Sequence, residues 1–512
     1  MARTPLAQAL EDAAAQIQSE EARTTRRGLL KGAGAAAVGA TLVGRMAAPA
    51  WAAHRDGPAI AVVGAGLAGL TCAYRLQQAG LYADVYEASS RIGGRCWTGR
   101  GAFADGQIYE HGGELIDSDH HPIRDLAAEL GLTLDNLIKS ETNGTTQLGY
   151  FFGKPYTYAQ MTSDFQQLNP QLQSDLTAAP FPTQYNSYTA RGAQLDHTSI
   201  YDYIEQYVPG GHKSAFGQYL DVAYNIEYGA ETKVQSSLNL LYLLAYQNPN
   251  QPFSTFGTSN EKFHIHGGND QIPTILAGHL GSQIVANTAL TAVKQNADGT
   301  FKLTFGSGAA AFDKSYDHVV FALPFSLLRE CDISHAGFSS LKQTAIQQLP
   351  MGTNTKFHVQ FTSRFWRNQG CNGETYSDRG YQNTWEVSRA QNGNSGLLSW
   401  YTGGNEGVAV GSGTPQSQAK TFLKQIEPVL PGATAAANGL VTRDYWTGYQ
   451  WTQGSYSYWK VGQYTGFSGI EGAREGNAYF CGEHTSVDSQ GYLNGAVDTG
   501  ETAAKQVIRR AT

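Results

Sequence analysis

The chain has 512 residues, of which 41% are hydrophobic and 15% are charged, and its formal net charge is −7. This composition excludes a disordered or fibrous chain and predicts a soluble globular protein with two or three packed lobes. The slight excess of acidic residues gives no basic patch, so we expect no nucleic-acid partner.

The N-terminal 53 residues differ in character from the rest of the chain. Arg26 and Arg27 precede a small, weakly apolar run over residues 32–44, and the sequence AWA follows at 50–52. This order is typical of a twin-arginine export signal, and the apolar run is too short to span a bilayer comfortably. We therefore expect residues 1–53 to direct export to the periplasm or the cell exterior, with no membrane anchor on the mature form. An ordinary N-terminal helix is the alternative, because residues 1–23 are long and acidic for such a leader.

The cysteines and histidines give no sign of a disulfide framework or a metal centre. The five cysteines are odd in number, far apart and without a C-x-x-C pair. This pattern agrees with a protein that folds in the reducing cytosol before export. His111, His120 and His121 are near one another in the sequence, but no group of residues has zinc-ligand spacing, so we expect no bound metal.

Residues 59–87 predict a strand, a glycine turn, a helix and a second strand. Gly64, Gly66 and Gly69 have the spacing G-x-G-x-x-G, and Glu87 ends the second strand. In such a unit the glycines permit the turn, the approach of a pyrophosphate to the helix N-terminus and close packing of helix on strand, while the acid binds a ribose. A purely structural turn is the weaker alternative. The expected dinucleotide contacts are Gly64, Gly66, Leu67, Ala68, Gly69, Glu87 and Ala88.

A second glycine turn decides which dinucleotide is expected. Arg91, Gly93, Gly94 and Arg95 form the pattern R-x-G-G-R, which can add a cation to the same pyrophosphate. This element resembles the FAD-binding flavin amine oxidases, which include monoamine, polyamine and L-amino acid oxidases. The resemblance extends over nearly the whole chain after residue 57 and implies FAD as the cofactor, with Gly94 and Arg95 among its contacts.

Four further segments carry the same resemblance. The segment YEHGGELID at 109–117 is similar to the stretch that passes the flavin ring, and HGGNDQIP at 266–273 is similar to a glycine entry into a helix. DHVVFALP at 317–324 and residues 478–504 resemble the last strands and the C-terminal helix, whose N-terminus would stabilise negative charge on the flavin. The implied contacts with FAD are Gly112, Gly113, Glu114, Leu115, Leu290, Glu483, Gly491, Tyr492 and Leu493.

The resemblance also implies the fold and the domain organisation. It predicts an α/β fold in which a Rossmann-type FAD-binding domain, of the glutathione-reductase type, is interleaved with an α+β substrate-binding domain. Residues 54–120, 260–330 and 440–512 would form the FAD-binding domain, and residues 121–259 and 331–439 the substrate-binding domain. A homodimer is a further expectation from the family.

Three residues are the predicted catalytic groups. Lys356 lies on a predicted strand and matches the family lysine that holds a water against flavin N5; a solvent-facing lysine at a strand end is the alternative. Tyr456 and Tyr492 match the two aromatic walls that hold the amine, with Tyr458 as an alternative for the first wall. Ser455 stands where some relatives have a cysteine that links the flavin, so FAD is expected to be bound non-covalently.

The choice between amines and amino acids depends on opposing signals. Leu115 occupies the place of an arginine that binds the substrate carboxylate in well-known L-amino acid oxidases, which counts against that activity. Residues 220–247 and 261–273 nevertheless resemble bacterial L-amino acid oxidases of broad or basic specificity, including reconstructed ancestral ones, and we give this more weight. Trp385 and Glu386 are the expected substrate contacts; Glu386 could pair with a cationic side chain, or be an exposed acid.

These observations predict an FAD-dependent oxidase that transfers a hydride from the amine-bearing carbon of an L-amino acid to flavin N5. The imine would hydrolyse to a 2-oxo acid and ammonia, and O2 would become hydrogen peroxide. A polyamine or monoamine oxidase, giving an aldehyde, is the alternative. A flavin desaturase or isomerase and an electron-transfer flavoprotein share the nucleotide motif, but Lys356 and the tyrosine pair argue against them.

Overall fold

The computed structural model describes residues 57–247 and 252–511, so the predicted export signal lies outside the described residues. Residues 57–512 form one compact unit. The boundaries of the two predicted domains therefore stay a prediction, and the sheets are the natural units of description.

A five-stranded parallel sheet carries the first glycine motif. Its strand order is β20-β13-β1-β2-β9, and every neighbouring pair is parallel. All four residues of β1 are buried, as expected for a strand with elements on both faces. The strands are β1 (Ile60–Val63), β2 (Ala83–Tyr86), β9 (Ile284–Val285), β13 (His318–Phe321) and β20 (Ala478–Phe480).

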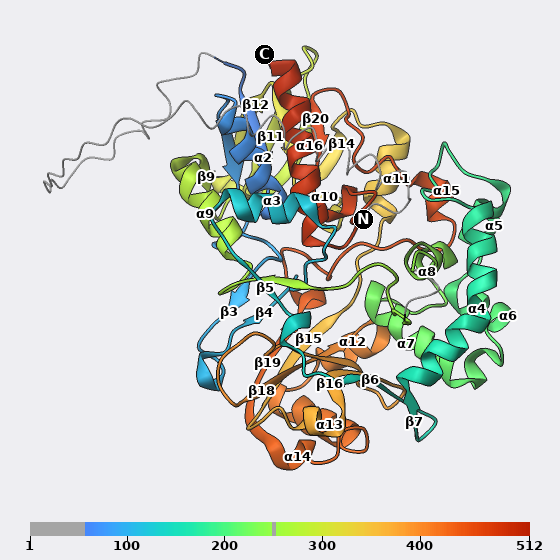
Figure 1. Ribbon diagram of the computed structural model, residues 1–512. Helices are drawn as coiled ribbons and strands as arrows, with labels where there is room; N and C mark the ends of the chain where they lie inside the picture. Colours follow the sequence, from blue (N-terminus) through green and yellow to red (C-terminus); the bar gives the residue numbers. More distant parts are fainter. Residues whose placement is uncertain (1–56, 248–251, 512) are drawn as a thin grey trace, which may run out of the picture. The chain divides into compact units, whose positions relative to one another are not determined.

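Four helices pack beside this sheet, and two of them lie side by side in Figure 1, α2 in blue and α16 in red. A Cβ on Gly500 of α16 would lie 2.4 Å from the carbonyl oxygen of Ala68, so the missing side chain allows the close approach of the two helices. The helices are α2 (Leu67–Gln78), α3 (His121–Glu129), α9 (Gln271–Leu280) and α16 (Leu493–Ala511). The parallel sheet and its helices confirm the predicted α/β fold.

A small four-stranded sheet follows in the order β12-β11-β10-β14. Its first three strands are antiparallel neighbours, and β14 pairs in parallel with β10. The strands are β10 (Leu290–Gln295), β11 (Phe301–Phe305), β12 (Phe312–Tyr316) and β14 (Asp332–His335).

A mixed seven-stranded sheet has the order β19-β15-β18-β17-β16-β6-β7. The strand β15 lies between β18 and β19, and all seven of its residues are buried. One aromatic core, in which Trp400 stacks on Phe422, joins the sheet to helix α13. The strands are β6 (Thr146–Phe151), β7 (Lys154–Thr157), β15 (Thr355–Phe361), β16 (Cys371–Ser377), β17 (Gln382–Glu386), β18 (Gly396–Thr402) and β19 (Ala437–Tyr445).

The remaining elements are helices and two short ribbons, in which β3 (Thr98–Gly99) pairs with β4 (Tyr109–Glu110) and β5 (Leu134–Asn136) pairs with β8 (Phe263–Ile265). No helix in the described part of the chain has both the length and the apolarity needed to cross a membrane. The other helices are α4 (Tyr158–Ala178), α5 (Ala190–Asp196), α6 (Ile200–Tyr207), α7 (Ala215–Tyr228), α8 (Ser237–Leu244), α10 (Phe325–Leu328), α11 (Ser340–Gln348), α12 (Gly404–Val410), α13 (Pro415–Ile426), α14 (Ala433–Ala436) and α15 (Gln463–Phe467).

Candidate active site

A cavity of about 570 Å³ is lined by nearly every predicted site residue. Its size is that of a small-molecule or cofactor site. Of the predicted site residues only Gly69 does not line it. Those that line it are Gly64, Gly66, Leu67, Ala68, Glu87, Ala88, Gly94, Arg95, Gly112, Gly113, Glu114, Leu115, Leu290, Lys356, Trp385, Glu386, Tyr456, Glu483, Gly491, Tyr492 and Leu493.

The glycine turn forms a shelf of bare backbone at one end of the cavity. Gly64 has φ 106°, and a Cβ there would lie 2.8 Å from a carbonyl oxygen of Ala322. The nearest atom to a Cβ on Gly66 is a Cα of Gly94 at 4.0 Å, so the two glycine turns face each other without side chains. Helix α2 starts at this shelf with no side-chain cap, which leaves its first N–H groups for an anion. The residues present therefore fit the pyrophosphate of a dinucleotide.

Gly69 has a packing position instead of a lining one. A Cβ on this residue would lie 2.0 Å from the carbonyl oxygen of Gly64, so only glycine lets α2 begin directly against the turn. This is the place that the third glycine of such a motif is expected to take. Gly69 thus supports the dinucleotide site from below without touching the cavity.

Two buried acids are held in fixed orientations along the cavity. Glu87 accepts hydrogen bonds from the backbone N–H groups of Ala65, at 3.0 Å, and Ser89, at 2.9 Å. Glu483 accepts from Arg95 at 2.8 Å and from the Gly491 N–H at 3.0 Å. Burial alone would raise the pKa of Glu483, but the charge of Arg95 outweighs it and lowers the pKa. Both carboxylates are therefore pre-oriented acceptors.

The N-terminus of α16 meets the YEHGGELID segment at the cavity wall. The helix begins at Leu493, directly after Gly491 and Tyr492. A Cβ on Gly113 would lie 2.7 Å from the Leu493 side chain, so this glycine allows the strand-like segment to pass against the helix start. The helix N-terminus therefore presents its positive dipole end to the same cavity.

Lys356 is held in the interior by an ion pair. Its side chain is 4% exposed, and Nζ contacts the carboxylate of Glu114 and donates to the Gly112 carbonyl oxygen at 3.1 Å. Trp385 donates from Nε1 to the other Glu114 oxygen at 3.1 Å. Burial raises the pKa of Glu114, but the Lys356 ammonium reverses this, and the net shift is downward. The structure excludes a solvent-facing lysine and holds Nζ of Lys356 against the Glu114 carboxylate.

The two predicted tyrosine walls both reach the cavity. The Tyr456 hydroxyl lies 3.0 Å from that of Tyr401 and donates to the Ile226 carbonyl oxygen at 3.1 Å. The Tyr492 hydroxyl donates to a Glu227 oxygen at 3.3 Å. Tyr458, the alternative for the first wall, is buried and does not line the cavity. The structure thus favours Tyr456 over Tyr458 as a wall.

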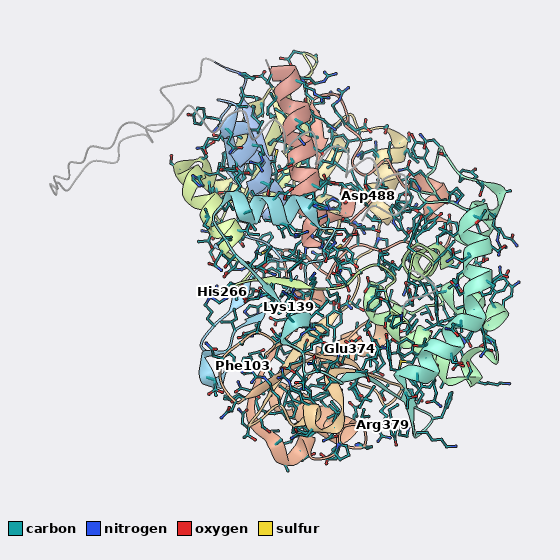
Figure 2. All side chains as sticks on the ribbon, in the orientation of Figure 1. Phe103, Lys139, His266, Glu374, Arg379 and Asp488 are labelled. Atoms are coloured by element: carbon teal, nitrogen blue, oxygen red, sulfur yellow. The ribbon has the colours of Figure 1, made fainter. Side chains whose placement is uncertain are left out.

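Sequence reasoning missed an acidic wall made by Glu227, Glu261 and Glu374, which all border the cavity. Figure 2 labels Glu374, which lies on β16 and accepts from the Tyr376 hydroxyl at 2.9 Å. Burial and neighbouring carboxylates raise the pKa values of Glu261 and Glu374. No spacing joins these three acids in the sequence, although Glu227 and Glu261 lie in the two stretches that carry the resemblance to L-amino acid oxidases.

The pairing of Glu386 with a cationic substrate stays a prediction, and the structure shows that this carboxylate already has partners in the protein. Its carboxylate is 1% exposed and accepts hydrogen bonds from Arg364 at 3.1 Å, from Trp366 at 2.9 Å and from Arg367 at 2.5 Å. Trp385 donates to Glu114, whereas its neighbour Glu386 borders the same cavity but is held by the two arginines and Trp366. The acid is used within the protein.

The cysteines and the histidines complete the description. All five cysteines are free. Asp117, Asp119 and His120 bring possible ligand atoms within 4.8 Å of one another. Both oxygens of Asp117 already accept hydrogen bonds from residues 259–261, so we assign no metal to this group.

Comparison with known proteins identifies the family. The family model of flavin-containing amine oxidoreductases matches residues 67–508. An L-amino-acid oxidase of Siganus canaliculatus is 24% identical, with 88% of this chain and 84% of that protein covered. Polyamine oxidase 7 of Oryza sativa subsp. japonica is also 24% identical, with 88% and 95% covered.

The fold is also that of a solved structure. Cyclohexylamine oxidase from Brevibacterium oxydans IH-35A superposes with a TM-score of 0.76 at 19% identity, over 89% of this chain and 99% of that one. These findings confirm the predicted family and its cofactor, FAD: the chain belongs to the flavin-containing amine oxidoreductases.

Proposed function

We propose that the protein is an oxidase that deaminates L-amino acids and prefers those with a cationic side chain, giving a 2-oxo acid, ammonia and hydrogen peroxide. The observation that carries the proposal is the acidic wall of Glu227, Glu261 and Glu374 in the cavity that also contains Lys356 and the tyrosine walls. When bound, FAD supplies the two-electron oxidation and returns the electrons to O2.

The walls of the cavity have the features needed to hold an amine. Tyr456 and Tyr492 offer two aromatic surfaces, which attract an amino group and exclude bulk water. Lys356 has a fixed ammonium, because Glu114 and the Gly112 carbonyl oxygen hold it. A fixed donor of this kind can orient one water molecule at the reacting end of the substrate. With a serine at 455, FAD would be held by non-covalent contacts alone.

The acidic wall supports a second positive charge on the substrate. Burial is the main cause of the raised pKa values of Glu261 and Glu374, and neighbouring carboxylates, among them Glu374 for Glu261 and Glu141 for Glu374, add to it. A cation placed among them reverses this penalty, since opposite charges within about 4–6 Å favour the ionised form. A substrate such as L-lysine or L-arginine would supply that cation at the end of its side chain.

A polyamine or monoamine oxidase is the second candidate, and one observation favours it. Leu115 lines the cavity where an arginine would bind the carboxylate of an amino acid. Arg389 also lines the cavity, but its guanidinium donates to Glu141 at 2.8 Å. A diamine would use the acidic wall in the same way and would not need a cation for its other end.

A product assay on the holoenzyme separates the two candidates. Peroxide is measured with the common L-amino acids, putrescine, spermidine and arylamines, and the carbonyl product is identified by mass. We expect the fastest turnover with L-lysine or L-arginine and the corresponding 2-oxo acid as product. Peroxide with putrescine or spermidine alone, together with an aldehyde, would replace the first candidate by the second.

We also propose export by the twin-arginine route, on the strength of the sequence order in residues 1–53. The expected result is a secreted or periplasmic protein shortened near residue 52. Replacing both Arg26 and Arg27 by lysine would then retain the protein in the cytoplasm, and unchanged export would contradict the proposal.

A further inference from the structure

Asp117 is a buried acid next to the cavity, and its carboxylate holds one turn of the backbone. Its side chain is 1% exposed. One oxygen accepts from the backbone N–H groups of Asn260, at 3.0 Å, and Glu261, at 2.6 Å, and the other accepts from the Ser259 hydroxyl at 2.8 Å. Three hydrogen bonds to consecutive residues fix the position of a segment more firmly than any single one of them.

The held turn has a backbone conformation that glutamate rarely adopts. Glu261 has φ 45°, in the left-handed region, which is unfavourable for a residue with a side chain. Ser118 adds two bonds to the side chain of Asn260, at 3.1 and 2.9 Å. Such a conformation persists where its surroundings hold it, and residues in this state cluster at ligand sites.

The turn places the Glu261 side chain at the border of the cavity. No hydrogen bond or ion pair joins its carboxylate to another side chain within residues 57–247 and 252–511, whereas Glu374 has Tyr376 and Glu227 has Tyr492. Glu261 is therefore the member of the acidic wall whose carboxylate is left for a ligand.

We propose that Glu261 binds the cationic end of the substrate and that Asp117 is the positioning residue that aims it. The inference rests on the proposed function, because it requires a substrate with a second positive charge. Asp117 has no contact of its own with the cavity space. It acts through the backbone of residues 259–261, and the bond from the Glu261 N–H is the direct link.

A second route from Asp117 to the site must be kept apart from this one. His120 Nε2 lies 3.3 Å from Asp117, and the His120 ring meets the Tyr492 ring edge-on at 5.0 Å between centroids. Action through this route would alter the tyrosine wall, which every substrate meets. Action through Glu261 would alter only substrates with a distal cation, so the choice of substrate distinguishes the routes.

The test compares L-lysine with L-norleucine, which is lysine without its ammonium group. The ratio of their kcat/KM values is measured for the wild-type holoenzyme, for Asp117→Ala, for Glu261→Gln and for the double variant. We expect the ratio to fall about tenfold or more in each single variant, because one charge contact of about 1.4 kcal/mol is lost. We expect no further fall in the double variant, since residues that act as a unit are not additive.

Conservative and remote variants serve as controls. Asp117→Asn keeps an oxygen for the two backbone N–H groups and should retain most of the discrimination. Ser259→Ala removes only the hydrogen bond from the Ser259 hydroxyl to Asp117. It should lower the ratio by a smaller factor, and it replaces Asp117→Ala in the test if that variant does not fold. Glu427→Ala removes a carboxylate that accepts from two backbone N–H groups at the start of α14, of Gly432 and Thr434, but does not line the cavity. It should leave the ratio unchanged.

Three results would overturn the inference. If Asp117→Ala lowers kcat/KM for both substrates by the same factor, its effect is transmitted through Tyr492 and not through Glu261. If the falls in the kcat/KM ratio of the two single variants add in the double variant, Asp117 and Glu261 act independently. Equal loss in Asp117→Asn and Asp117→Ala would make the charge, not the geometry, the cause.

The proposed function has its own distinct sign of failure. Wild type that turns over putrescine better than butylamine, but no L-amino acid, would reject the amino acid substrate. The variants are then compared on that amine pair, with the same expected loss of discrimination. Wild type that prefers neither cationic substrate to its uncharged partner would reject Glu261 as a cation site.

Discussion

Two lysines of this protein are buried beside a glutamate, and the two pairs differ in one contact. In the cavity, Nζ of Lys356 touches the Glu114 carboxylate. On α11, Nζ of Lys342 donates to the backbone carbonyl oxygen of Glu471 at 2.7 Å and lies 3.8 Å from the centre of the Phe480 ring. The Glu471 carboxylate has one oxygen without a partner among the described residues.

The consequences for charge are opposite. The pKa of Glu114 is lowered, because the lysine outweighs the effect of burial. At the second pair, burial lowers the pKa of Lys342 to about 7 and raises that of Glu471 to about 7. Burial without contact between the charged ends therefore favours the neutral forms of Lys342 and Glu471, whereas contact with Lys356 favours the ionised form of Glu114. The comparison teaches that contact with Lys356, and not the degree of burial, is what keeps the Glu114 carboxylate ionised in the cavity.

Breaking the cavity pair should have the largest effect. Lys356→Met removes the fixed ammonium and leaves Glu114 as an uncompensated buried charge. The free energy of unfolding should fall by about 3–5 kcal/mol as a result. We expect kcat to fall by roughly 10² or more, the usual contribution of a positioned proton-transfer group. Steady-state kinetics and urea unfolding measure the two effects. Unchanged kinetics would contradict the role of Lys356.

Removing both charges of the cavity pair should separate stability from activity. The double variant Lys356→Met with Glu114→Gln has no charge left at this pair. The free energy of unfolding should therefore recover by about 3 kcal/mol relative to Lys356→Met alone. Activity should stay low, because the ammonium is still absent. Denaturant midpoints at equal slope provide the measurement, and a return of activity would show that only folding had been impaired.

The second pair should produce a pH dependence that Glu471→Gln removes. A carboxyl whose pKa is raised from 4.5 to about 7 in the folded protein stabilises it fully below pH 4.5. That contribution is lost as the pH rises from 4.5 to 7 and amounts to at most about 3 kcal/mol. Urea titrations across this range should show a falling free energy of unfolding in wild type and a flatter profile in Glu471→Gln. Identical profiles would refute the assignment.

At pH 7 the smallest effect is expected for Lys342→Met. Because the folded pKa of this lysine is about 7, the wild-type protein gains stability as the pH rises from 7 to 10.5, and the variant should lack this gain. At pH 7 the free energy of unfolding should change by no more than about 1–2 kcal/mol, since a buried amine that is about half neutral at this pH is replaced by an apolar side chain of similar volume. Turnover should match wild type. A loss as large as that of Lys356→Met would erase the distinction between the pairs.

Local motifs made much of the nucleotide end predictable. The spacing of Gly64, Gly66 and Gly69 predicts a strand, a turn and helix α2. A side chain at Gly64 or Gly69 would collide with nearby backbone, and the spacing alone indicates this requirement. The strand around Lys356 was also predictable. Its burial between β18 and β19 was decided by the sheet order, which the sequence does not show.

The substrate end was harder to predict, and the errors have physical causes. The partners of Glu386, which are Arg364, Trp366 and Arg367, come from a different segment of the chain, so the sequence around Glu386 does not show them. Glu227, Glu261 and Glu374 come from α7, from the turn before β8 and from β16, so only tertiary packing brings them to one wall. Leu115 could be read from the sequence as a departure from the family arginine, whereas nothing local indicated that the three acids would border the same cavity.

Anaerobic mixing of the holoenzyme with L-lysine tests the central claim most directly. We predict that the visible absorbance of the flavin is lost, and that admission of air restores it with one hydrogen peroxide formed for each 2-oxo acid. An absorbance that persists with L-lysine, L-arginine, putrescine and spermidine alike would contradict the account.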